Sequence, residues 1–310
     1  MKEKCLLLGG AGFIGKNLAM RLLRENYEVT VYDFYVKQNY SEEELKQINY
    51  YERELFKDTD LKSVIENQDV VIHLVSSVGP ENSMINPERC YYNDVAKTVE
   101  ILEIMRKCGV NKMIFISSGG TVYGDVNCES LKEDMQLFPQ NHYGITKVTI
   151  EKILQMYNQI YQMENIIVRV ANPYGTGQQS KKGIGAVTVF AEKILKSEII
   201  EIWGDGSVVR DYIYIDDVVN MITKFVEYKV NDFNIAYNIG TGVGTSLNQL
   251  IKELELQIGK KADVSYKQGR NIDVQRNVLN MEKTFHAIGN VLEYSLSKGI
   301  KKYLQIINVR

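Results

Sequence analysis

The 310-residue sequence lacks the features that would place it in several broad classes of protein. Its 37 basic and 39 acidic side chains leave a net charge of −2 without long blocks of like charge, so nothing favours a nucleic-acid partner or a membrane surface. No apolar run approaches the roughly 18 residues of a membrane-spanning helix. No internal repeat or low-complexity linker is visible. The length and ordinary composition therefore indicate one large or two moderate globular domains.

Metal-ligating residues are also few. The four cysteines show no C-x-x-C spacing and the three histidines are scattered, so we expect no metal site. Free thiols suit a reducing cytoplasm, and a first strand that begins at Lys4 leaves no room for a signal peptide. We therefore expect a cytoplasmic protein.

The most informative stretch lies at residues 4–15. The apolar run 5–8 ends in glycines and a helical pattern follows at once, which predicts a strand, a tight turn and a helix. In the spacing G-x-x-G-x-x-G, Gly9 permits the turn, Gly12 lets a pyrophosphate approach the backbone, and Gly15 lets helix pack closely on strand. The helix N-terminus offers free N–H groups and a partial positive charge. The whole unit predicts a dinucleotide-binding site.

A carboxylate ends the next apolar run, at 29–32. Asp33 lies where it can accept hydrogen bonds from an adenosine ribose and would repel a 2′-phosphate, so NAD is favoured over NADP as the cofactor. Asp58, which precedes a helix expected at 61–67, has two interpretations that the sequence leaves open. It contacts the adenine amino group, or it caps the helix.

Two later apolar runs end in loops that carry hydroxyl groups. Run 70–75 has the character of a strand buried on both faces, and His73 within it is expected to be a core residue rather than a catalyst. Run 113–116 is followed by Ser117, Ser118 and a glycine-rich loop. Such loops at strand carboxyl ends form the ligand crevice of open α/β sheets, so hydroxyls there are candidates to bind a substrate oxygen. A Ser/Thr-rich turn without function is the alternative.

Tyr143 and Lys147 lie at the start of a long helix expected to reach residue 163. Their spacing of four residues puts them on one helix face. A Tyr with a pKa of about 10 is a poor base at neutral pH, but a nearby ammonium group and the positive charge of an oxidised nicotinamide would favour the phenolate. We therefore expect Tyr143 to be the general base for an alcohol proton and Lys147 to be its partner and a ligand of ribose hydroxyls.

The alternation of strands and helices weakens after a buried strand expected at 166–170. Trp203 is expected to pack in the core or a loop rather than to form a stacking platform. Arg210, beside Asp211, could form a surface ion pair. Because guanidinium forks suit phosphate oxygens, Arg210 and Arg270 are also candidates for a diphosphate clamp.

Taken in order, these motifs resemble the extended short-chain dehydrogenases/reductases, in the NAD-dependent epimerase/dehydratase branch that acts on nucleotide sugars. The UDP-glucose 4-epimerases are the nearest general model. The resemblance covers essentially the whole chain and rests on these segments: GGAGFIG at 9–15, VIHL at 71–74, Ser-Ser and Val-Tyr-Gly within 117–124, Tyr-x-x-x-Lys at 143–147, Asn-Pro-Tyr-Gly at 172–175, Gly-Asp-Gly and Arg-Asp-Tyr within 204–212, and Arg270 with Asp273.

The resemblance implies a doubly wound parallel (Rossmann) α/β sheet with a smaller C-terminal substrate-binding domain. It implies NAD contacts from Gly9, Gly12, Phe13, Ile14, Gly15, Asp33, Asp58, Leu74, Ser76, Ser117, Tyr143 and Lys147. It implies substrate contacts from Asn172 to the sugar nucleotide, from Arg210 and Arg270 to the diphosphate, and from Asp273 at the nucleotide end. The reaction implied is C4 epimerisation of a UDP-sugar through a transient 4-keto intermediate.

The resemblance also implies how the chain is divided and assembled. An NAD-binding domain is expected at 1–175 and a nucleotide-sugar-binding domain at 176–310, with segments near 216–240 returning to the main sheet. A homodimer is expected through helices near 91–108 and 143–163.

Four positions depart from the family pattern. Gly119 stands where relatives often carry Ser or Thr, so Ser118 or Thr121 must supply the catalytic hydroxyl, and the sequence leaves that choice open. Asp94 stands where Asn is usual, which puts one cofactor contact in doubt. Ser76-Ser77 replaces a small apolar pair.

Two further positions bear on the reaction type. Gly120 and Thr121 replace the acidic pair of the 4,6-dehydratases, so dehydration is the less favoured reaction. The main alternative is a nucleotide-sugar dehydrogenase or 4-reductase with NAD(P)H as a true co-substrate. A non-catalytic NAD-binding scaffold is disfavoured because it would not need Tyr143 and Lys147.

Overall fold

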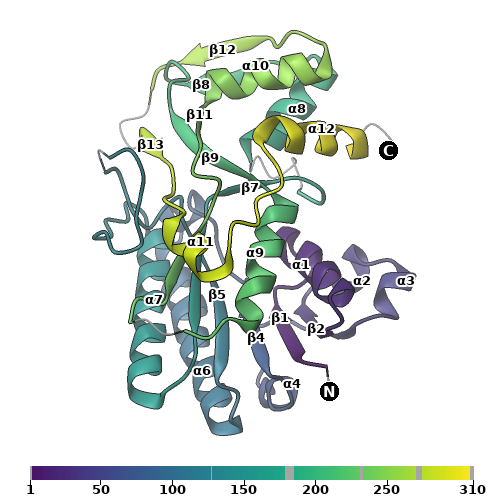
Figure 1. Ribbon diagram of the computed structural model, residues 1–310, viewed down its shortest axis with the longest axis vertical. Coiled ribbons are helices and arrows are strands. Elements are labelled where there is room, and N and C mark those ends of the chain that lie inside the picture. Colours follow the sequence, from purple (N-terminus) through teal and green to yellow (C-terminus); the bar gives the residue numbers. More distant parts are fainter. Residues whose placement is uncertain (1, 127, 179–184, 231–232, 270–273, 308–310) are drawn as a thin grey trace.

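The computed structural model describes residues 2–126, 128–178, 185–230, 233–269 and 274–307. Two of the expected substrate ligands, Arg270 and Asp273, lie outside the described residues. A larger α/β part carries the N-terminus, and a smaller group of strands and helices from the second half of the chain lies at one end of it (Figure 1).

A seven-stranded sheet forms the centre of the larger part, in the order β10-β6-β5-β4-β1-β2-β3. Its strands are β1 (Lys4–Leu8), β2 (Glu28–Asp33), β3 (Asn49–Glu52), β4 (Val70–His73), β5 (Lys112–Ser118), β6 (Ile166–Val170) and β10 (Ala236–Ile239). Every neighbouring pair is parallel. The chain order reverses between β1 and β4, which is the switch point of a doubly wound fold. The expected Rossmann α/β class is confirmed.

Helices cover both faces of this sheet (Figure 1). The described residues form the helices α1 (Phe13–Arg24), α2 (Val36–Asn39), α3 (Glu42–Leu45), α4 (Lys62–Ile65), α5 (Pro87–Arg89), α6 (Ala96–Cys108), α7 (His142–Tyr161), α8 (Ala186–Lys196), α9 (Ile215–Glu227), α10 (Leu247–Ile258), α11 (Glu282–Ile288) and α12 (Leu296–Ile307), with a 3-10 turn η1 (Asn82–Met84) and a π-helical segment η2 (Cys90–Val95).

The core consists of two apolar clusters, one on each face of the sheet. Alternate residues of a strand point to opposite faces, and β1 illustrates this. Cys5 and Leu7 join the cluster under α1, whereas Leu6 and Leu8 join the cluster that contains α6 and α7. Because both faces are covered, the central strands are apolar at nearly every position.

The smaller part is built around β9 (Val209–Tyr214). This strand pairs with β7 (Asn172–Tyr174), β11 (Gly244–Ser246) and β13 (Arg276–Asn277). A separate pair is formed by β8 (Ile200–Trp203) and β12 (Val264–Lys267). Helices α8, α10 and α12 lie around these strands (Figure 1).

Two elements from the second half of the chain belong with the larger part. β10 pairs with β6 in the main sheet. Helix α9 lies against α1, where Arg21 donates a hydrogen bond to Asn220 at 3.0 Å and Tyr27 donates one to Glu227 at 2.9 Å. The division at residue 175 stays a prediction.

Local sequence signals had mixed outcomes. Ser41 and Glu44 form a capping box at the start of α3, and Gly109 ends α6 in the left-handed conformation at φ +75°. The helix expected from residue 91 instead starts as the π-helical η2 and becomes α-helical at Ala96. His73 is buried, as expected. Among the described residues, no helix has the length and apolar character needed to cross a membrane.

Candidate active site

The glycine turn between β1 and α1 has the expected geometry. Gly9 adopts φ +88°, a conformation that glycine adopts without strain. A Cβ atom at Gly15 would lie 2.3 Å from the Gly9 carbonyl oxygen, so only glycine lets the helix lie this close to the turn. Gly12 is exposed, and a Cβ there would meet only the Gly9 oxygen, at 3.3 Å. The exposed face of the turn therefore remains open to a ligand.

The start of α1 suits an anion. Gly12 is its N-cap, no side chain caps it, and its first turn carries no acidic residue. The first N–H groups of a helix have no partner within it, so those of half-buried Phe13 and Ile14 are available to phosphate oxygens. These residues fit the pyrophosphate of a dinucleotide.

Asp33 ties the end of β2 to this turn. Its Oδ2 accepts a hydrogen bond from the Ala11 N–H at 3.0 Å, and its Oδ1 accepts one from the Phe34 N–H at 2.7 Å. A carboxylate held beside the glycine turn is the arrangement that a ribose contact requires.

Asp58 does not cap a helix. Helix α4 begins at Lys62 with Leu61 as its N-cap and no side-chain capping bond, so the capping interpretation is wrong. The Oδ2 atom of Asp58 instead accepts a hydrogen bond from the Tyr32 hydroxyl at 2.7 Å, and its Oδ1 atom accepts one from the Asp60 N–H at 2.8 Å. A contact with adenine stays a proposal.

The loop after β4 is held by a carboxylate. Leu74 extends the strand ladder through its N–H to Leu8. The hydroxyl of Ser76 and the N–H of Ser77 both donate to Asp94, each at 2.8 Å. Asp94 was recognised as a departure from the family pattern, but its two partners were not.

The hydroxyl of Ser117 is engaged within the protein. It donates to Glu151 at 2.6 Å, and Glu151 forms a buried ion pair with Arg169 at 2.7 Å. The single proton of Ser117 is therefore used before any ligand is considered. Neither Glu151 nor Arg169 was singled out in the sequence, although a charge in the middle of an apolar strand was a usable signal.

Gly119 is explained by packing. A Cβ there would lie 2.7 Å from Cδ1 of Leu279 and 3.1 Å from the carbonyl oxygen of Val170, so Ser or Thr would not fit without movement. The half-buried Ser118 precedes it at the end of β5. The hydroxyl of Thr121 is enclosed and has no hydrogen-bond partner among the described residues.

Tyr143 and Lys147 lie together on α7. Asn141 caps this helix by accepting from the Gly144 N–H at 2.7 Å, which sets its start. Nζ of Lys147 lies 5.4 Å from the Tyr143 ring centroid and donates to the carbonyl oxygen of Ile116 in β5 at 2.9 Å. The pair is thus fixed at the carboxyl end of β5.

Burial dominates the electrostatics of this pair. Burial, reinforced by Asp94, raises the pKa of Tyr143 to about 12. Burial lowers the pKa of Lys147 to about 8, although Asp94 and Glu151 act in the opposite direction. In the protein without cofactor, desolvation is therefore the largest effect on the pKa of Tyr143. The expectation that Lys147 and an oxidised nicotinamide together favour the phenolate stays a prediction.

A cavity of about 310 Å³ is lined by residues of β7, β8, β9 and the start of α8. Asn172 and Arg210, both expected substrate ligands, line it. Trp203, at the end of β8, also lines it and is 45% exposed, so of the two expected packing environments the core is excluded and the loop stays a prediction. Asp211 is completely buried and accepts from Thr241, so the interpretation of Arg210 and Asp211 as a surface ion pair is wrong too.

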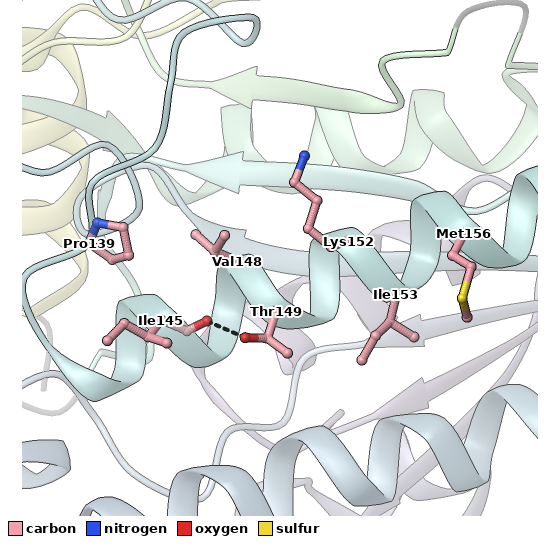
Figure 2. Close-up of a pocket in the computed structure, with 7 residues that line it drawn as sticks. All are labelled: Pro139, Ile145, Val148, Thr149, Lys152, Ile153 and Met156. Atoms are coloured by element: carbon pink, nitrogen blue, oxygen red, sulfur yellow. Dashed lines mark hydrogen bonds between the residues drawn. The ribbon is translucent and has the colours of Figure 1, made fainter.

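A second hollow, of about 450 Å³, lies on the outer face of α7. Ile145, Ile153 and Met156 project from this face (Figure 2), beside Val148 and Thr149. Its lining is almost entirely apolar, which is unusual for an exposed helix face.

Comparison with known proteins agrees with this geometry. A family model described as the NAD dependent epimerase/dehydratase family matches residues 5–240. The chain therefore belongs to that family, and NAD is the cofactor for which its glycine turn is suited.

Three relatives illustrate the similarity. The chain is 34% identical to a putative UDP-glucose 4-epimerase of Methanocaldococcus jannaschii, over 96% of each chain. Its structure is similar to that of a UDP-glucose 4-epimerase from Thermotoga maritima solved with UDP-glucose, with a TM-score of 0.91, 32% identity and 99% coverage of each chain. It is also similar to a Thermus thermophilus UDP-glucose 4-epimerase in complex with NAD, with a TM-score of 0.87, 26% identity, and coverage of 98% of this chain and 99% of that one.

Proposed function

We propose that this protein is an NAD-dependent nucleotide-sugar epimerase that inverts C4 of a UDP-sugar through a 4-keto intermediate. The observation that carries the proposal is the Tyr143–Lys147 pair on α7, held at the crevice edge where the glycine turn also lies. The similarity to UDP-glucose 4-epimerases over nearly the whole chain supports the substrate class.

Each residue then has a task in proton transfer. Tyr143 accepts the proton of the sugar 4-hydroxyl and returns it after C4 has been inverted. NAD, held by the glycine turn, would supply a reversible hydride acceptor for C4, so that inversion leaves no net NADH. Lys147 holds an ammonium charge beside the phenol and offers donors to ribose hydroxyls. Because the protein alone raises the pKa of Tyr143, the charge of the oxidised cofactor is needed to favour the phenolate.

The hydroxyl that assists Tyr143 is proposed to be that of Ser118. Its side chain is half-buried at the end of β5, so a substrate oxygen can reach it. The hydroxyl of Thr121, by contrast, is enclosed. The backbone of Thr121 is packed against α7, since a Cβ added at Gly144 would lie 2.9 Å from the Thr121 carbonyl oxygen. Thr121 is the alternative.

The cavity lined by Asn172, Trp203 and Arg210 is proposed to take the nucleotide and diphosphate. A guanidinium fork matches phosphate oxygens, and an indole offers an apolar face to a base. Arg270 and Asp273 are proposed to complete this site, as the resemblance implies.

The test is incubation of the purified protein, with NAD, with a panel of UDP-sugars, followed by chromatography of the sugar nucleotides and absorbance of NADH. We expect paired C4 epimers at equilibrium and no net NADH. Stoichiometric formation or loss of NADH would instead identify a dehydrogenase or 4-reductase. An unchanged panel would contradict the assignment.

We further propose a homodimer in the cytoplasm. The apolar hollow on the outer face of α7 supports the dimer, since that helix is one of the two that the resemblance assigns to the interface. The free cysteines of the chain suit a reducing compartment.

A further inference from the structure

Two departures from the family pattern meet in space. Asp94 replaces the usual Asn, and Ser76-Ser77 replaces the usual small apolar pair. The Ser76 hydroxyl and the Ser77 N–H donate to the two different oxygens of Asp94, both at 2.8 Å. Asp94 is 5% exposed, so it is a buried carboxyl group that accepts a hydrogen bond at each oxygen. An apolar pair at 76–77 would leave one of these bonds unmade.

The segment that carries Asp94 lies directly against the catalytic helix. In η2, the Tyr91 hydroxyl is hydrogen-bonded to Nδ1 of His142 at 2.9 Å, and His142 begins α7. The Cys90 thiol is hydrogen-bonded to the side chain of Thr146, which lies between Tyr143 and Lys147 in the sequence. Asp94 follows Cys90 by about one turn of η2, and both are buried.

Resting on the proposed function, we propose that Asp94 is a positioning residue for the reaction. It fixes the Ser76–Ser77 turn beside the catalytic helix, and its buried carboxylate holds Lys147 as an ammonium ion next to Tyr143.

The charges around Lys147 support this role. Burial lowers the pKa of Lys147 to about 8, close enough to neutral pH for the charge to be lost without help. Asp94 and Glu151 oppose that loss. Glu151 is shared with Arg169 in a buried ion pair, whereas the donors to the Asp94 carboxylate among the described residues, Ser76 and Ser77, are uncharged.

The remaining titratable neighbours do not supply a negative charge. Burial, reinforced by Lys147, lowers the pKa of His73 to about 3, so this residue of β4 is neutral. Burial and Asp94 raise the pKa of the Cys90 thiol, so it remains protonated. The pKa of Tyr143 is raised by burial and by Asp94. Removal of the Asp94 charge should therefore lower the pKa of both Tyr143 and Lys147.

The test is the Asp94→Asn variant, which keeps the shape of the side chain and removes its charge. The holoenzyme is labelled with [13Cε]lysine, the Lys147 signal is assigned with Lys147→Arg, and its pKa is read from an NMR titration. We expect that pKa to fall by about one unit, the size expected for loss of a nearby opposite charge. In the epimerase assay, both limbs of the pH profile should move to lower pH.

Two control variants separate charge from structure. Ser76→Ala removes a hydrogen bond to Asp94 and keeps the carboxylate, so the Lys147 pKa should stay as in the unmodified protein. Glu100→Gln removes a charge from the exposed side of neighbouring α6 and should likewise leave it unchanged. If Asp94→Asn is recovered unfolded, Asp94→Ser replaces it in the same titration.

An unchanged Lys147 pKa in the charge-removing variant would overturn the proposal, as would an equal fall in Ser76→Ala. The titration does not depend on turnover. A failed UDP-sugar panel would therefore contradict the proposed function without being confused with a failure of this inference.

Discussion

At the scale of single residues, the active site is governed by desolvation. Tyr143 and Lys147 lie close together, yet burial shifts both pKa values in the direction that favours the neutral form of each side chain. The pKa of the Tyr143 phenol is raised to about 12, and the pKa of the Lys147 amine is lowered to about 8. The protein therefore supplies position, and the bound ligands must supply part of the charge that favours proton transfer.

The first residue-scale prediction concerns the base. Tyr143→Phe should lower kcat by about 10²- to 10⁴-fold, the usual contribution of a general base, and leave NAD affinity nearly unchanged because the ring is kept. The measurement is steady-state turnover with calorimetric titration of NAD. Tyr157→Phe is the matched control, since Tyr157 lies on the same helix and donates to Glu103, away from the site. Full turnover in the Tyr143 variant would refute the proposed chemistry.

The second concerns the assisting hydroxyl. Ser118→Ala should lower kcat by at least about tenfold, because a hydrogen bond to the reacting oxygen is lost, whereas Thr121→Val should have a much smaller effect. Turnover of each variant on one UDP-sugar, with NAD affinity as a check on folding, decides between them. The reverse order would assign the role to Thr121.

At the scale of elements, the strand–turn–helix unit at β1 and α1 depends on two glycines in different ways. Gly15→Ala would put a methyl group 2.3 Å from the Gly9 carbonyl oxygen, so the helix must shift, and we expect a loss of about 1–3 kcal/mol of stability together with NAD binding. In Gly12→Ala the added methyl group would contact only that oxygen, at 3.3 Å. We expect this variant to fold normally and to bind NAD more weakly. Thermal unfolding and NAD titration test both. A Gly15→Ala protein with unchanged Tm would contradict the packing argument.

The same contrast shows which features could be predicted from the sequence. The turn, its glycines and the Asp33 carboxylate are local, because each signal lies within a few residues of the element that it specifies. The alternation of strand and helix signals indicated an α/β fold, and the family resemblance implied the doubly wound sheet. The reason for a glycine at position 119 could not be predicted in this way. A Cβ there would collide with Leu279, which is distant in the sequence.

Contacts that join distant elements could not be predicted in this way. The Ser117–Glu151–Arg169 cluster joins β5, α7 and β6. The hydrogen bonds that Asp94 accepts from Ser76 and Ser77 join η2 to the loop after β4. Trp203 ends β8, is 45% exposed and lines a cavity together with residues of β7 and β9. No local pattern carries this information, since it arises only when the sheet brings the elements together.

At the scale of the whole molecule, the outer face of α7 is the surface that bears on assembly. Ile145, Met156, Ile160 and Tyr161 are exposed by 39%, 41%, 62% and 44%. Ile145, Ile153 and Met156 line one hollow, which follows from a helical spacing of three to four residues and its multiples. A contiguous apolar helix face on a protein surface indicates a partner.

We expect a second copy of the chain to cover this face. The Ile145→Lys/Met156→Lys double variant should therefore be monomeric by light scattering at concentrations where the unmodified protein is a dimer, because two charges would be desolvated in the interface. Leu256→Lys is the control, since Leu256 is 75% exposed on α10, far from α7 in the fold (Figure 1), and should leave the mass unchanged. Far-ultraviolet circular dichroism establishes that both variants are folded. A dimer that survives both substitutions would mean that another surface joins the subunits, and a monomeric unmodified protein would remove the proposed assembly altogether.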